Sequence, residues 1–144
     1  MIYTPLTIQA MKLAYTAHHG QTDKSGMPYI HHPLHLAEQM SDEFSACVAL
    51  LHDIVEDTDI TLEDLSLEFP PQVTEAVALM THDPAVPYME YVAHIKENPI
   101  ARRVKIADLI HNSDATRMTA AGFDPEQLTG RLQKYQQALA FLCE

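Results

Sequence analysis

Apolar residues recur along this chain at the spacing of an α-helix, and nowhere do they alternate with a period of two over a useful length. Such alternation is typical of strands in a half-buried sheet, so its absence favours an all-α fold. The apolar pattern and the proline positions predict a bundle of about eight helices, at 5–19, 33–40, 42–56, shortly after Thr61, 70–81, 87–97, 99–118 and 125–142.

The starts of several of these helices are marked by local signals. Thr4-Pro5 and Asn98-Pro99 each combine a capping side chain with proline at the first helical position, where its missing N–H costs nothing. Thr61 is followed three residues later by Asp64, which resembles a capping box. These signals predict where the helices begin.

Length and composition narrow the class of protein. A chain of 144 residues with 47% hydrophobic residues is expected to form a single domain, 1–144, with a real core. The net charge of −11 argues against binding of nucleic acid, and no apolar run is long enough to cross a membrane. The two cysteines form no disulfide or zinc-finger pattern, and the N-terminus lacks the features of a signal peptide, so we expect a cytoplasmic protein.

The stretch LLHDIVEDT, residues 50–58, places polar side chains directly after a run that is apolar on every side. His52, Asp53, Glu56 and Asp57 occupy one sector of the helix. One turn earlier, Ala46 and Ala49 fill this sector, with Leu50 at its border. A helix that is apolar all round is buried, so we expect these four side chains to open into a pocket within the bundle.

Asp108 raises the same question in a second helix, since it lies in the apolar segment VKIADLIHN. A buried carboxylate without a partner costs several kcal/mol, so such groups pair, become protonated or bind metal. His32 precedes Pro33, which is expected to hold it outside any helix, and His31 and His35 are alternative ligands beside it. Two or three imidazoles with two carboxylates would suit Mn, Fe or Zn better than Ca or Mg.

Three segments carry a resemblance to a known family. The runs AHHGQTDKSGMPYIHHP, ALLHDIVEDTDIT and VKIADLIHN resemble the signature segments of the HD-domain hydrolases of the RelA/SpoT type, including small stand-alone alarmone hydrolases. The resemblance extends over about residues 10–118 and implies an all-α HD fold. It also implies hydrolytic removal of the 3′-pyrophosphate from ppGpp or pppGpp, a small nucleotide substrate.

The resemblance further implies roles for individual residues. One divalent metal, usually manganese, would be held by His32, His52, Asp53 and Asp108. Glu56 and Asp57 would position or activate the attacking water, and Lys24 and Asn112 would line the nucleotide pocket. Glu56 follows His52 by one turn and Asp57 follows Asp53 by one turn, so both acids are expected on the metal-binding side of their helix. The cation, with Lys24 and one of Arg102, Arg103 or Arg117, would attract a polyphosphate to this acidic protein.

The chain departs from the family pattern at two places. Asp23 stands where alarmone hydrolases usually have an arginine that packs on the guanine base, and an aspartate cannot do this. Leu109, Ser113 and Asp114 replace a lysine and a Leu-Arg pair that are common after the family's Asp and Asn. The metal-binding pattern is therefore intact, while the residues expected to read the base and the phosphates are altered.

Three functional hypotheses follow. The first is a metal-dependent alarmone hydrolase, and the second is an HD phosphohydrolase that acts on another nucleotide or phosphorylated metabolite. The third is an HD module that binds metal and nucleotide without turnover. The intact Glu56 and Asp57 count against the third, because a binding site needs no carboxylate to activate water.

Overall fold

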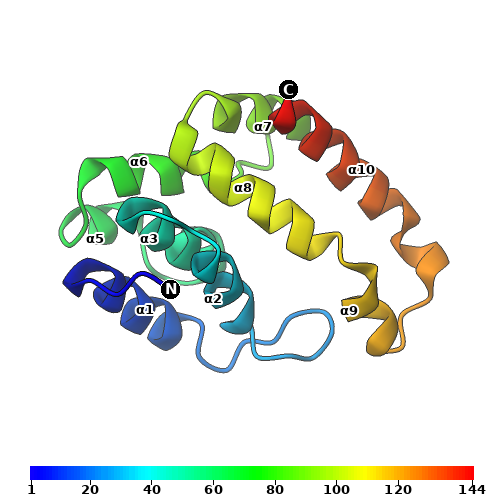
Figure 1. Ribbon diagram of the computed structural model, residues 1–144, viewed down its shortest axis with the longest axis horizontal. Helices are drawn as coiled ribbons and strands as arrows, with labels where there is room; N and C mark the ends of the chain where they lie inside the picture. Colours follow the sequence, from blue (N-terminus) through cyan, green and yellow to red (C-terminus); the bar gives the residue numbers. More distant parts are fainter.

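The protein is an all-α bundle in the computed structural model, which describes the backbone of residues 1–144 and every side chain except those at positions 125 and 127. Its helices, labelled in Figure 1, are α1 (Pro5–Ala17), α2 (His31–Glu38), α3 (Glu43–Leu51), α4 (Ile54–Asp57), α5 (Leu62–Ser66), α6 (Pro71–Met80), α7 (Tyr88–Lys96), α8 (Pro99–Asn112), α9 (Ala115–Ala120) and α10 (Pro125–Cys143). Across this described backbone there is no strand, only one isolated bridge between Thr22 and Pro28. The predicted fold class is confirmed.

Helix α3 lies at the centre of the bundle. It packs against α1, α2, α6 and α8, while α10 runs back along α8 at the edge of the molecule (Figure 1). Every residue from 46 to 51 is fully buried, as expected for a helix that is apolar on all sides. The polar residues that follow this segment therefore emerge from the core rather than from a solvated surface.

Two of the predicted helices are interrupted, which turns the eight predicted helices into ten segments. The helix predicted at 42–56 ends at Leu51, and Asp53 has φ −106° and ψ 3°, outside helical geometry, before α4 begins. The helix predicted at 99–118 ends at Asn112, and the Asp114 side chain then caps α9 by accepting from the N–H of Thr116. Both breaks lie beside predicted site residues and change the direction in which they point.

The prediction that Pro33 holds His32 outside a helix is wrong. His32 lies in the first turn of α2, and Pro33 is the third residue of that helix. Proline is tolerated there because N–H groups of the first turn have no partner within the helix. His32 is consequently held by a rigid helix that packs against α3 and α8.

The three helix starts that were predicted from capping residues are confirmed. Thr4 caps α1 and Thr61 caps α5, each in a capping box, and the Asn98 side chain accepts from two N–H groups at the start of α8. None of the described helices is both long enough and apolar enough to cross a membrane.

Asp42 caps the central helix α3, and its substitution tests how much this cap stabilises the protein. Its carboxylate accepts from the N–H of Ser45 at 2.8 Å and pairs with the exposed guanidinium of Arg103 at 2.6 Å. We expect Asp42→Ala to lower the free energy of unfolding by about 1–2 kcal/mol, mostly through the lost cap, because exposed ion pairs contribute little. Urea unfolding measures this, and Asp59→Ala, at an exposed position, is the control expected to stay within about 0.5 kcal/mol. Equal effects of the two substitutions would contradict the role of the cap.

Candidate active site

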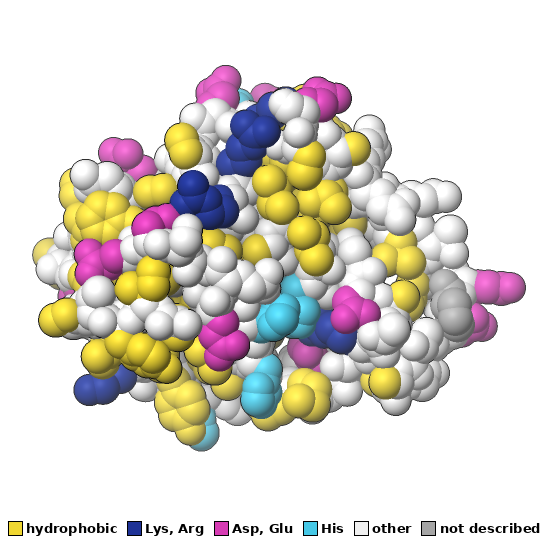
Figure 2. Space-filling model, viewed as in Figure 1, with side chains coloured by type: hydrophobic (Ala, Val, Ile, Leu, Met, Phe, Trp, Pro, Cys, Tyr) yellow, Lys and Arg dark blue, Asp and Glu magenta, His cyan; other side chains and the backbone are white. Residues whose placement is uncertain are grey.

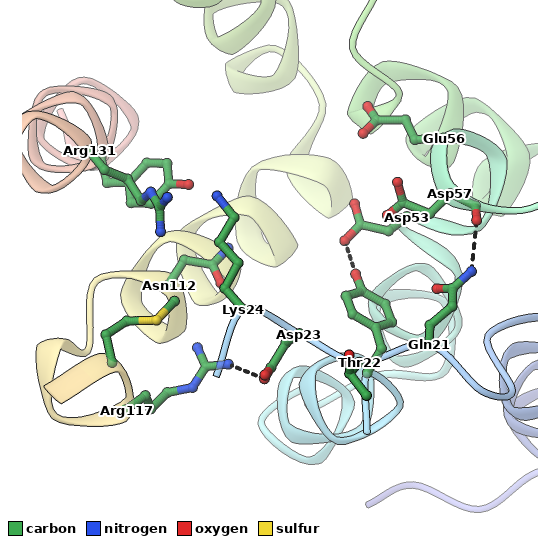
Figure 3. A pocket seen from close by; sticks show the side chains of 13 residues that line it. Gln21, Thr22, Asp23, Lys24, Asp53, Glu56, Asp57, Asn112, Arg117 and Arg131 are labelled. Carbon is green, nitrogen blue, oxygen red and sulfur yellow. Dashed lines mark hydrogen bonds and ion pairs between the residues drawn. The ribbon is translucent and has the colours of Figure 1, made fainter. Parts of the chain in front are cut away.

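A cavity of about 780 Å³ opens between the loop after α1, helix α4, the end of α8, and helices α9 and α10. The acidic wall of this cavity contains Asp53, Glu56 and Asp57. The facing, basic wall contains Lys24, Arg117 and Arg131 (Figure 3). The full set of lining residues is Gln21, Thr22, Asp23, Lys24, Tyr29, Asp53, Glu56, Asp57, Asn112, Arg117, Met118, Arg131 and Tyr135. The predicted substrate-binding residues Lys24 and Asn112 are both among them.

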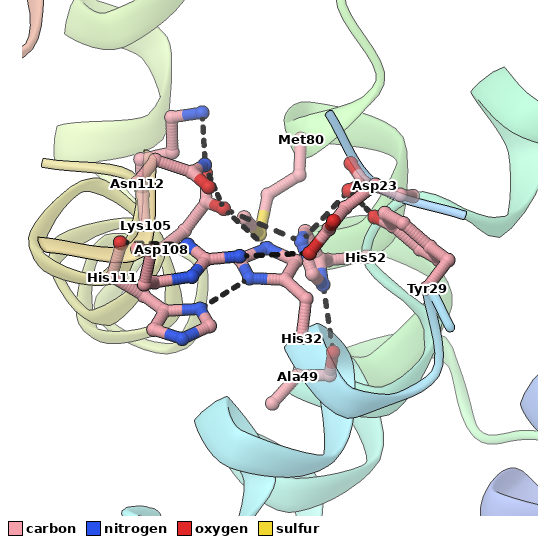
Figure 4. A network of polar contacts seen from close by, with 12 residues as sticks. Asp23, Tyr29, His32, Ala49, His52, Met80, Lys105, Asp108, His111 and Asn112 are labelled. Atoms are coloured by element: carbon pink, nitrogen blue, oxygen red, sulfur yellow. Dashed lines mark hydrogen bonds and ion pairs between the residues drawn. The ribbon is translucent and has the colours of Figure 1, made fainter. Parts of the chain in front are cut away.

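A cluster of potential metal ligands lies at the acidic wall. One ligand atom each from His32, His52 and Asp53 lie within 4.8 Å of one another. Asp108 adds a carboxylate from α8, with Oδ1 at 2.9 Å from Nε2 of His32 and 3.6 Å from Nε2 of His52 (Figure 4). The structure thus brings together all four residues predicted as metal ligands, from α2, the break between α3 and α4, and α8.

The ring of His52 is oriented to offer a free nitrogen to this cluster. Its Nδ1 lies 2.7 Å from the carbonyl oxygen of Ala49, and because a carbonyl only accepts, Nδ1 must carry the proton that is donated. The other nitrogen, Nε2, is buried and makes no hydrogen bond, although it lies 3.1 Å from Oδ2 of Asp53. A backbone carbonyl that fixes one nitrogen while the other stays available is the usual arrangement of a histidine metal ligand.

The electrostatics of the cluster also favour a bound cation. Burial lowers the pKa of His52, but the negative charges of Asp53 and Asp108 outweigh it and raise this pKa well above its ordinary value. The two carboxylates therefore create a field that attracts positive charge to the point where Nε2 lies. Two imidazoles and two carboxylates are a donor set that suits a divalent transition metal, so the residues present fit such an ion.

Asp108 is held by several partners at once. It is only 5% exposed, and it accepts from Nζ of Lys105 at 2.9 Å and from Nδ2 of Asn112 at 3.0 Å. Burial raises the pKa of Asp108, but the charge of Lys105, the hydrogen bond with His32 and the nearby imidazole of His52 hold it well below its usual range. Asp108 is therefore ionised, and its hydrogen bonds fix its position within the core.

Tyr29 connects the loop to the cluster. Its hydroxyl donates to Oδ2 of Asp53, and its ring centroid lies 4.7 Å from that of the buried His18. The Nδ1 of His18 lies 2.8 Å from Oε1 of Gln21, whose amide donates to the backbone carbonyl of Asp57. Through these contacts Tyr29 anchors the loop and orients Asp53.

Glu56 and Asp57 lie on α4 beside the cluster, exposed to the cavity. The Glu56 carboxylate accepts from the backbone N–H of His82. The surrounding protein and the negative charge of Asp53 raise the pKa of Glu56, against the opposing hydrogen bond from His82. Burial and Asp53 likewise raise the pKa of Asp57, so both groups are better proton acceptors than a free carboxylate.

The other histidines considered from sequence take different places. His31 and His35 lie outside the described metal cluster and line a second cavity, which His32 also lines. His111 stacks on His32 with ring centroids 5.0 Å apart, and their Nδ1 atoms are 2.7 Å from each other. His111 therefore supports the orientation of His32.

The basic residues of the site were only partly anticipated. Arg103 pairs with Asp42 away from the cavity, and Arg102 is not among the described lining residues, so of the three candidate arginines only Arg117 lines the cavity. Sequence reasoning missed Arg131 on α10 and the pairing of Lys105 with Asp108. Lys105 precedes Asp108 by three residues in a helix, a spacing that would have revealed the pair.

Known proteins resemble this chain over most of its length. The family described as "HD domain" matches residues 10–104. The mouse protein named guanosine-3′,5′-bis(diphosphate) 3′-pyrophosphohydrolase MESH1 is 34% identical over 142 residues, which cover 89% of this chain and 77% of the mouse protein. The chain belongs to the HD-domain family.

A bacterial protein and a solved structure also resemble this chain. The bifunctional (p)ppGpp synthase/hydrolase SpoT of Escherichia coli is 45% identical over 73 residues, which cover 48% of this chain and 10% of SpoT. A solved structure, described as a metazoan ortholog of SpoT that hydrolyzes ppGpp, matches with a TM-score of 0.75 and 24% identity. It covers 99% of this chain and 87% of that one, and it therefore supports the all-α HD fold along the whole chain.

Proposed function

We propose that this HD domain is a divalent metal-dependent phosphohydrolase that removes the 3′-pyrophosphate from guanosine alarmones, ppGpp or pppGpp. The observation that carries the proposal is the convergence of His32, His52, Asp53 and Asp108 at the edge of a cavity that also contains Glu56. The name of the mouse relative supports the choice of substrate, because it states a 3′-pyrophosphohydrolase of guanosine-3′,5′-bis(diphosphate).

His32, His52, Asp53 and Asp108 would hold the metal, for which we propose Mn²⁺. When bound, such an ion lowers the pKa of water and polarises a phosphoryl oxygen, so that no covalent nucleophile is required. The free Nε2 of His52 and the ionised Asp108 are the donors that the structure orients best for this purpose.

The residues of the acidic wall would handle the proton of the attacking water. Glu56 accepts this proton as a general base, since its carboxylate is exposed to the cavity and its pKa is raised. Asp57 orients the water from the next position of the same helix. Hydrolysis of the 3′ phosphoester then yields pyrophosphate and the guanosine 5′-diphosphate or 5′-triphosphate.

The basic wall would bind the phosphates that are not cleaved. Lys24 and Arg131 line the cavity opposite the acids (Figure 3), and burial followed by the charge of Arg131 lowers the pKa of Lys24. Two cations this close repel each other, and an anionic group between them relieves that repulsion. A protein with a net charge of −11 thereby gains a local site for a polyphosphate.

Cys47 and Cys143 are free thiols, which supports our placing this activity in the cytoplasm.

Hydrolysis of a nucleotide panel tests the proposal. The protein is depleted of metal with a chelator, reloaded with Mn²⁺, Mg²⁺ or Zn²⁺, and supplied separately with ppGpp and with each other nucleotide of the panel, and the products are separated by anion-exchange chromatography. We expect GDP and pyrophosphate with Mn²⁺, and a loss of at least about 100-fold after chelation, because the metal supplies several kcal/mol of transition-state stabilisation.

Other outcomes of this experiment would select the rival functions. Hydrolysis of other nucleotides but not of ppGpp would identify a phosphohydrolase with another substrate. Tight binding of metal and nucleotide without products would identify a binding module. Either result would overturn the proposed alarmone hydrolase.

A further inference from the structure

An ion pair closes the basic end of the cavity. Nη2 of Arg117, on α9, lies 3.1 Å from Oδ2 of Asp23, which is 94 positions earlier in the chain (Figure 3). Nη1 of the same guanidinium donates to the carbonyl oxygen of His111 at 2.8 Å. The side chains of Arg117 and Asp23 are only 21% and 15% exposed, so the guanidinium is fixed in a partly desolvated position.

Asp23 is itself fixed by the loop. Its Oδ1 accepts from the N–H of Ser25 at 2.9 Å, from the hydroxyl of Ser25 at 2.6 Å and from the N–H of Met27 at 3.0 Å. One oxygen therefore organises the turn and the other holds Arg117. Asp23 thus positions Arg117, and most of its capacity to accept further hydrogen bonds is already used.

The pair forms a wall between two cavities. Asp23 and Arg117 line both the active-site cavity and the second cavity, of about 550 Å³, which also contains His31, His35 and Asp114. On the face shown in Figure 2, histidine side chains gather with acidic and basic ones in a hollow between α2 and α9. The position of the guanidinium consequently sets where the active-site cavity ends.

The charge of Arg117 differs from that of its basic neighbours. Asp23 balances it, whereas no carboxylate lies within ion-pair distance of Lys24 or Arg131 in the described part of the chain. Unbalanced cations suit phosphates, while a balanced guanidinium is better suited to a neutral polar group. Within the described residues, two of its five N–H groups are engaged, which leaves three donors for a ligand.

We propose that Arg117, positioned by Asp23, contacts the base of the nucleotide and gives this site a preference for guanine over adenine. Guanine presents the acceptors O6 and N7 on one edge, which match guanidinium donors, whereas adenine places an amino group there. This inference rests on the proposed function. It assigns the guanidinium on α9 that is paired with Asp23 to the base and not to a phosphate.

A comparison of the guanosine and adenosine 3′,5′-bis(diphosphates) tests the inference. We measure kcat and KM for both with Mn²⁺ in the unmodified protein and in Arg117→Met, Asp23→Asn and the double variant. Asparagine keeps an oxygen for the loop N–H groups while removing the charge that holds Arg117. Arg103→Met is the matched control, because that guanidinium pairs with Asp42 outside the cavity.

We expect the unmodified protein to prefer guanine and Arg117→Met to lower that preference at least about fivefold, mainly through KM for the guanosine substrate. Asp23→Asn should shift the ratio in the same direction, and the double variant should match Arg117→Met, since Asp23 acts through Arg117. Circular dichroism and thermal unfolding confirm that the variants fold, and Arg103→Met should leave the ratio unchanged.

The possible contrary results are distinct. An unmodified protein without preference between the bases, an unchanged ratio in Arg117→Met, or additive effects of the two substitutions would overturn the inference while leaving the hydrolase intact. Hydrolysis of neither nucleotide by the unmodified protein would overturn the proposed function, and this inference with it.

Discussion

Asp108→Ala is expected to remove both the bound metal and the hydrolytic activity. The carboxylate lies near the imidazoles of both His32 and His52. Without it, the cluster loses one of its two negatively charged candidate ligands. We expect a loss of at least about 10³-fold in kcat/KM, the equivalent of roughly 4 kcal/mol, since the metal supplies several kcal/mol. Elemental analysis of the purified variant and ppGpp turnover measure the two effects separately.

Stability must be separated from chemistry in this experiment. Asp108 also neutralises Lys105, whose side chain is 12% exposed, and removal of one partner of a buried ion pair costs about 3–5 kcal/mol. Asp108→Asn preserves size and part of the hydrogen bonding, and it should fold while still losing metal and turnover. Asp59→Asn, at an exposed position that does not line the cavity, is the control expected to retain both. Full activity in Asp108→Asn would show that the metal site is misassigned.

The candidate metal ligands could be identified from the sequence because burial makes polar groups costly. His52, Asp53 and Asp108 each interrupt an apolar helix, and the cost of burying an unpaired charge is enough to infer that they share a function. The all-α class followed from periodicity, and the starts of α1, α5 and α8 followed from capping residues that act within three positions of themselves. Each of these signals is local or is forced by the energetics of the core.

The parts of the fold and of the site that were not predicted depend on contacts that the periodicity of apolar residues does not show. A helical wheel assumes a continuous helix, so it could not predict the breaks at 52–53 and 113–114. These breaks set the directions of the His52 and Arg117 side chains. Arg131 lies on a helix whose sequence reads as an ordinary solvated face, and it enters the site only because α10 packs back along α8. Asp23 appeared to remove a guanidinium from the pocket, and only the three-dimensional structure shows that it holds another one there.

Glu56→Gln is expected to separate metal binding from catalysis. Glu56 lies outside the described group of metal-ligating atoms, and glutamine keeps an oxygen to accept the N–H of His82, so metal content and KM for ppGpp should be nearly unchanged. Without a carboxylate to take the proton of the attacking water, kcat should fall by about 10²–10⁴-fold.

The dependence of kcat on pH provides a second readout for Glu56→Gln. The partly buried surroundings and the negative charge of Asp53 raise the pKa of Glu56, so the unmodified enzyme should lose rate as the pH falls through this raised pKa and the base becomes protonated. The residual rate of Glu56→Gln should lack that acidic limb. Gln72→Glu, at an exposed position outside the cavity, reverses the chemical change and should leave the profile intact. If Glu56→Gln retains its metal, full kcat and the same acidic limb, the proton passes to another group, and Asp57, the next carboxylate of α4, becomes the residue to replace.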